Sequence, residues 1–167
     1  MSTTTAPAVT LIRADEGEVY SIIGEKVIFK VTQADTNGAY SIFEMVAQPG
    51  GGPPLHTHLS SESFHVLEGE IEFSTLEDGV LKSVRGKAGD TIFVPAGAMH
   101  TYSAFGNAPC RTVSVLVPGG DMEAFFREAG TRIEPGQPEP GGAPDIPAML
   151  AVAARHGLEF APPPGEN

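Results

Sequence analysis

Short apolar or alternating segments, separated by turn residues, follow one another from residue 9 to residue 117. In Glu70-Ile71-Glu72-Phe73 the apolar side chains alternate with glutamates, as on a strand with one buried face. Similar patterns predict strands at 9–12, 19–23, 26–32, 40–47, 55–58, 63–67, 70–75, 81–84, 91–94, 99–104 and 111–117. Many short strands with no long amphipathic helix among them predict an all-β protein, an antiparallel sandwich or barrel.

The pattern changes after this stretch, where two short helices are predicted. Asp121 is a candidate N-cap for a helix over 122–129, and Asp145 is a candidate N-cap for a second helix that ends at Gly157. Between them, half of residues 130–147 are Gly or Pro, a composition that predicts a loop.

The chain is therefore expected to form a barrel over residues 1–120 and a C-terminal extension over 121–167. At 167 residues one domain is the default. The 20 glycines and 15 prolines fit a fold with many tight turns.

Charge and targeting signals narrow the function classes. The formal net charge of −11 argues against nucleic acid and anionic membranes as partners. No long apolar run or signal sequence is visible, so we expect a soluble, cytoplasmic protein. The only cysteine, Cys110, cannot form an intrachain disulfide, and we expect it to be buried and structural.

Three of the five histidines, His56, His58 and His65, lie within ten residues of one another. On a strand, the spacing of His56 and His58 sends both imidazoles to the same face. Glu62 can return to them from the next strand, whereas His65 points the other way and is expected to have a structural or surface role. His100, on a later predicted strand, is a candidate fourth ligand.

Neutral imidazoles with one carboxylate suit one divalent transition metal such as Ni, Mn, Fe, Co, Cu or Zn. An isolated His-x-His pair is as consistent with hydrogen-bonded histidines as with a metal site. The residues around the histidines therefore decide between these interpretations.

Those surrounding residues resemble the cupin family. The spacing Gly50-x5-His56-x-His58-x3-Glu62-x6-Gly69 is similar to the first cupin motif, and Gly89-x5-Pro95-x-Gly97-x2-His100 is similar to the second. The resemblance is close over residues 40–117. It departs from the family at Ala104, where an asparagine is common.

The resemblance implies a cupin double-stranded β-helix, or jelly-roll barrel, with a short helical C-terminal extension. It also implies that His56, His58, Glu62 and His100 bind the metal, and that Glu62 serves additionally as a catalytic proton acceptor. Four protein ligands leave two positions open on a six-coordinate ion. The chain most resembles small bacterial single-domain cupins of the quercetin 2,3-dioxygenase type, in which a flavonol reacts with dioxygen.

The substrate pocket is less defined by the sequence. Phe64 and Tyr102 share strand parity with Glu62 and His100, and Phe43 and Met45 are candidates for a further apolar wall, although core packing alone would explain all four. The scarcity of Lys and Arg favours an aromatic or flavonol-like substrate over a sugar phosphate.

Two alternatives to a dioxygenase remain. One is a metal-assisted cyclase, isomerase or epimerase of a polyketide-like or other oxygenated metabolite, and the other is a non-catalytic small-molecule-binding cupin. A homodimer is expected, formed through exposed strand edges such as residues 9–12.

Overall fold

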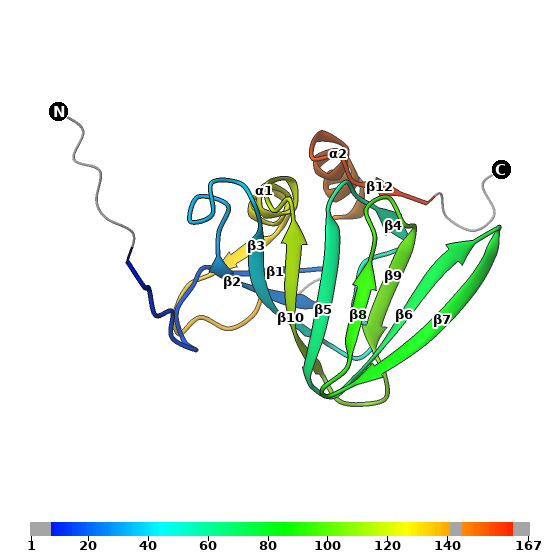
Figure 1. Ribbon diagram of the computed structural model, residues 1–167, viewed down its shortest axis with the longest axis horizontal. Coiled ribbons are helices and arrows are strands. Elements are labelled where there is room, and N and C mark those ends of the chain that lie inside the picture. Colours follow the sequence, from blue (N-terminus) through cyan, green and yellow to red (C-terminus); the bar gives the residue numbers. More distant parts are fainter. Residues whose placement is uncertain (1–7, 141–144, 162–167) are drawn as a thin grey trace.

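Alternating burial along the strands builds two antiparallel sheets in the computed structural model, which describes residues 8–140 and 145–161 (Figure 1). From one edge of the first sheet to the other, in the order β11-β1-β2-β3-β10-β5-β8, the strands are Thr131–Ile133, Val19–Ile22, Glu25–Val31, Ser41–Ala47, Cys110–Val117, Ser61–Glu68 and Thr91–Val94. In the second sheet, β12-β4-β9-β6-β7, they are Glu159–Phe160, His56–Thr57, His100–Ala104, Glu70–Glu77 and Val80–Lys87. This all-β architecture is the predicted fold class.

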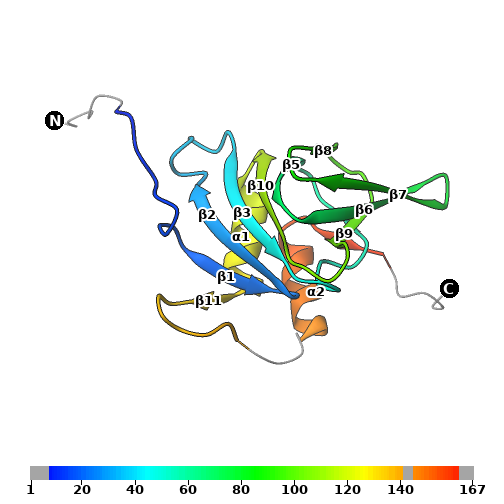
Figure 2. The same cartoon turned by 90° about the horizontal axis from the view of Figure 1, so that it is seen from below.

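The core lies between the two sheets (Figure 2). The ring of Phe64 on β5 packs against those of Phe73 on β6 and Tyr102 on β9, with ring centroids 4.8 and 5.1 Å apart. Aromatic contacts of this kind join one sheet to the other. Cys110 is fully buried in β10, as expected, and burial raises the pKa of its thiol to about 11.

Helix α1 (Gly120–Ala129) begins earlier than the sequence predicts. Its N-cap is Gly119, and Asp121 lies within the first turn rather than at the cap. A Cβ on Gly119 would lie 2.1 Å from Ser41 Oγ, so the close approach to β3 selects glycine at the cap. The helix buries Phe126 edge-on against Phe43, with centroids 5.4 Å apart.

Helix α2 (Ile146–Arg155) begins where the sequence predicts. The carboxylate of Asp145 accepts a hydrogen bond from the backbone N–H of Ala148 at 3.1 Å, which is the predicted capping interaction. The helix buries Met149 and Ala153 and contacts α1. Neither described helix combines the length and the apolar character needed to cross a bilayer.

Two further predictions of local structure are wrong. Residues 9–12 form no strand, because no other described strand pairs with them, and Val9 and Leu11 are exposed. The expected loop at 130–147 contains β11, which pairs antiparallel with β1. Pairing with an existing sheet edge therefore outweighs the local Gly and Pro content.

The C-terminal residues contribute to both sheets. β11 extends the first sheet, and β12 pairs with β4 in the second, placing Phe160 opposite His56. The boundary at residue 120 between barrel and extension stays a prediction, since both segments share these sheets.

Candidate metal centre

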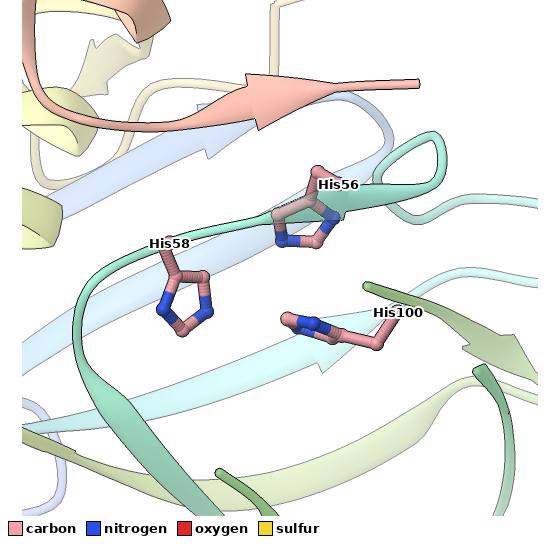
Figure 3. A group of neighbouring side chains, drawn as sticks. All are labelled: His56, His58 and His100. Carbon is pink, nitrogen blue, oxygen red and sulfur yellow. The ribbon is translucent and has the colours of Figure 1, made fainter. Parts of the chain in front are cut away.

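Two neighbouring strands bring three histidines together. His56 begins β4, His58 follows it directly, and His100 begins β9, where it lies opposite His56 in the antiparallel pairing (Figure 3). All three side chains are buried. Their candidate ligand nitrogens lie within 4.8 Å of one another.

The turns that precede these strands depend on glycine. Gly52 has a φ of +123°, and a Cβ there would lie 2.0 Å from the carbonyl oxygen of Tyr102. Only glycine lets this loop lie directly on β9. Thr101 Oγ1 donates a hydrogen bond to the carbonyl oxygen of Pro53 at 2.7 Å, which also holds this loop against β9.

Backbone carbonyls fix two of the rings. His56 Nδ1 lies 2.9 Å from the carbonyl oxygen of Pro54, and His100 Nδ1 lies 2.9 Å from that of Ala98. A carbonyl accepts but does not donate, so both Nδ1 atoms carry the proton in the neutral rings. This assignment leaves the Nε2 lone pairs of both rings available to a metal.

The surroundings also keep the imidazoles of His56 and His100 uncharged. Burial, reinforced by the neighbouring His100, lowers the pKa of His56 to about 3. Burial lowers the pKa of His100 as well. At neutral pH these two rings are therefore in the form that binds metal ions.

Glu62 lies beside the three rings but outside the group of nitrogens that are mutually within 4.8 Å. Its Oε2 is 3.4 Å from His58 Nε2, and its Oε1 accepts a hydrogen bond from Ser114 Oγ. The carboxylate is buried on β5 and has one oxygen directed to the histidines.

Unpartnered nitrogens test whether this arrangement fits a metal. Both ring nitrogens of His58 and Nε2 of His100 are buried and have no hydrogen-bond partner among the described residues. Buried polar atoms are normally satisfied, and a bound cation would satisfy these. The donor set, three imidazoles with an adjacent carboxylate, fits one divalent transition metal.

A small, mainly apolar cavity of about 20 Å³, room for about one water molecule, adjoins His56 and Glu62. Of the four predicted pocket residues, Met45 and Tyr102 line it. Phe43 and Phe64 do not; both are fully buried among other core rings. The remaining wall is supplied largely by α1 and by the segment around β12, including Phe125, Phe126, Leu158 and Phe160.

Glu25, a second buried carboxyl group that lines this cavity, was not among the residues predicted from the sequence. Tyr102 Oη donates a hydrogen bond to Glu25 Oε2 at 3.0 Å. Burial raises the pKa of Glu25 to about 8, and the nearby Glu62 adds to the increase. The alternation of residues along β2 could have identified it, because Glu25 lies on the same strand face as the apolar residues Val27 and Phe29.

His65 lies away from the site, as predicted. Its side chain is exposed, and Nδ1 lies 3.0 Å from Thr91 Oγ1.

Comparisons with known proteins are consistent with this geometry. A family model described as a cupin domain matches residues 43–116. A structure of recombinant oxalate oxidase in complex with glycolate is similar to the chain, with 27% identity and a TM-score of 0.50 over 59% of this chain and 55% of that one. A predicted oxalate decarboxylase from Thermotoga maritima has 25% identity and a TM-score of 0.55, covering 65% of this chain and 99% of that one.

A Bacillus subtilis oxalate decarboxylase shares the fold, with 18% identity and a TM-score of 0.58 over 71% of this chain and 32% of that one. The chain thus spans about half the length of the oxalate oxidase and about a third of this decarboxylase. No curated protein matches the chain significantly.

Proposed function

This chain belongs to the cupin superfamily, and from that membership we propose that it is a metal-dependent dioxygenase acting on an aromatic or flavonol-like small molecule. The observation that carries the proposal is the set of unpartnered, buried imidazole nitrogens of His58 and His100, next to His56 and the carboxylate of Glu62.

We assign His56, His58, Glu62 and His100 as the metal ligands. The bound metal would act as a Lewis acid and would hold substrate and dioxygen at its open positions. The carbonyls of Pro54 and Ala98 orient the rings of His56 and His100 through Nδ1.

Glu62 is proposed to be the proton acceptor. Ser114 Oγ donates to its Oε1, which leaves Oε2 on the side of the histidines to accept a proton from a substrate hydroxyl. Burial of this carboxylate among apolar side chains excludes water, so the transferred proton is retained in the site.

The cavity favours an uncharged substrate. Among the described residues that line it, none is a lysine or an arginine, and two are the glutamates Glu25 and Glu62. The oxalate enzymes that share the fold act on a small dianion, which these walls would hold only at a high desolvation cost. An aromatic molecule with hydroxyl or carbonyl oxygens suits the apolar wall better.

One observation favours a second candidate function, a metal-assisted cyclase, isomerase or epimerase. Glu25 and Glu62 line the same cavity, and the raised pKa of Glu25 makes it a candidate proton donor opposite the acceptor Glu62. A proton donor and a proton acceptor that face one cavity are a common basis for moving protons within one substrate.

Oxygen consumption separates the two candidates. The purified chain is reconstituted with Ni, Mn, Fe or Co and offered a panel of flavonols and polyketides with and without dioxygen. We expect metal-dependent oxygen uptake, lost in His56→Ala and retained in the exposed control His65→Ala. Turnover without oxygen uptake would favour the cyclase or isomerase, and binding without turnover would indicate a ligand-binding cupin.

Elemental analysis gives an independent check. Protein purified without chelator should contain one divalent metal per chain. An absence of metal, together with unchanged stability and ligand binding in His56→Ala, would contradict the proposal.

A further inference from the structure

The core-facing side of β7 carries an apolar side chain that remains exposed to solvent. Val84 on β7 pairs with Phe73 on β6, and Phe73 in turn pairs with Tyr102 on β9. Cross-strand partners lie on the same face of a sheet, so all three side chains lie on the face that packs into the core. Phe73 and Tyr102 are 4% and 7% exposed, whereas Val84 is 59% exposed.

The unequal lengths of two facing strands explain this exposure. β7 has eight residues and β8 has four. At Gly86 the two strands are close, since a Cβ there would lie 2.6 Å from Ile92 Cδ1. β8 ends at Val94, and the β6–β7 hairpin projects beyond it (Figures 1 and 2). The half of β7 nearer the hairpin turn therefore has no strand of the first sheet opposite it.

A groove of about 500 Å³ lies beside Val84, between the β6–β7 hairpin and the segment from β8 to the start of β9. This volume is within the range of about 300 to 1,000 Å³ that small-molecule sites occupy. His100, one of the three clustered histidines, forms part of the groove wall. The cavity beside His56 and Glu62 measures about 20 Å³, so the body of a substrate needs this larger space.

The walls of the groove offer mainly apolar contacts. Leu76 and Phe93 line it, and both side chains are exposed. None of the described residues that line the groove is a lysine or an arginine, and the carboxylate of Glu77 is paired with Lys82 at 2.5 Å. Exposed apolar patches of this kind mark binding sites, and these walls suit an uncharged, mainly apolar ligand.

We propose that this groove binds the body of the substrate, an uncharged aromatic molecule, and that Val84 is a substrate-contacting residue. The aromatic body covers the exposed Val84 side chain, and the oxygen-bearing end of the molecule lies at His100. The inference deepens the proposed function by assigning where its substrate lies, and rests on that function for calling the ligand a substrate.

Two substitutions on one strand separate the groove from the rest of the hairpin. Val84→Glu places a carboxylate on the groove wall. Leu81→Glu places the same charge on the opposite face of β7, at a position that is similarly exposed, 57%. A ligand that covers residue 84 must desolvate the first carboxylate and leaves the second in water.

The probe is flavone, an uncharged aromatic ketone without a hydroxyl group, which does not chelate the metal. Equilibrium dialysis measures its dissociation constant for the wild type and both variants after reconstitution with zinc. Because desolvating a carboxylate is costly, the constant should rise about 10-fold or more in Val84→Glu and stay within about 2-fold of wild type in Leu81→Glu. An unchanged constant in Val84→Glu, or equal increases in both variants, would overturn the inference.

Methyl NMR of the wild type is a second measurement that needs no charged variant. In protein with labelled Val, Leu and Ile methyl groups, flavone should shift the signals of Val84 and Ile92 more than those of Leu81. Shifts confined to methyl groups outside the groove would refute the site, even if Val84→Glu failed to fold.

Sedimentation velocity of the same proteins tests the other possible occupant of the groove, a second copy of this chain. Weaker flavone binding in Val84→Glu, with all three proteins equal in size, supports the proposal. A dimer that dissociates only in Val84→Glu, with an unchanged flavone constant, would assign the groove to a subunit interface and overturn it.

The zinc content of the same samples keeps the two proposals distinguishable. Protein that shows the expected flavone constants but holds no zinc would retain the groove and contradict the metal-dependent function. Bound zinc with equal flavone constants in all three proteins would do the reverse.

Discussion

Protonation of His56 should destabilise the metal-free protein in acid. Burial and the neighbouring His100 lower the pKa of His56 from 6.5 to about 3 in the folded chain, whereas the unfolded chain regains the ordinary value. Between these two values the unfolded state binds more protons than the folded state. Stability must therefore fall as the pH decreases through this window.

The size of the effect follows from the two pKa values. A difference of one pKa unit corresponds to about 1.4 kcal/mol, so the His56 contribution to acid unfolding reaches about 4 kcal/mol when the pH falls to 3. Between pH 7 and pH 5 the titration of His56 lowers the free energy of unfolding by about 2 kcal/mol. For a chain of this size that change lowers the Tm by about 4 to 8 °C.

The assay is urea unfolding of chelator-treated protein at pH 7 and pH 5, comparing wild type with His56→Gln. The wild type should lose about 2 kcal/mol more than the variant over this interval, because glutamine does not titrate. The exposed control His65→Gln should follow the wild type. Equal losses in wild type and His56→Gln would refute the assignment of a strongly lowered pKa to His56.

Three further predictions concern the same site. Divalent metal at 100 times its dissociation constant should stabilise the wild type by about 2.7 kcal/mol in thermal unfolding, and much less in His58→Ala; an equal gain would place the metal elsewhere. Glu62→Gln should lower turnover more than metal content, and equal losses would leave Glu62 as a ligand only. The pKa of Glu25 is about 8 in the folded chain and 4.5 in the unfolded chain, so the folded state binds its proton more tightly. Stability therefore falls as the pH rises between these two values. Metal-free wild type should therefore lose about 3 kcal/mol more than Glu25→Gln between pH 5 and pH 8, and parallel urea-unfolding profiles would contradict this value.

The grouping of His56, His58 and His100 could be predicted because local rules determine it. Strand parity places the first two on one face, and the turn residues before each strand fix where the strand begins. The same rules predicted the capping of α2 by Asp145.

The features that sequence reasoning missed depend on partners distant in the chain. The strand β11 exists because the edge of β1 accepts it, and no local pattern reveals that edge. The burial of Glu25 depends on Tyr102, 77 residues away. A charged residue at the start of a strand is more often exposed, so parity alone did not identify this one.

The pairing of β12 with β4 also has a consequence for biosynthesis. During translation His56 is made about 100 residues before Phe160, the residue that lies opposite it in the finished sheet. A nascent chain halted before β12 would contain all three histidines but lack the strand that pairs with β4. The sheet that carries His56 and His100 is therefore completed only after this late segment has been synthesised.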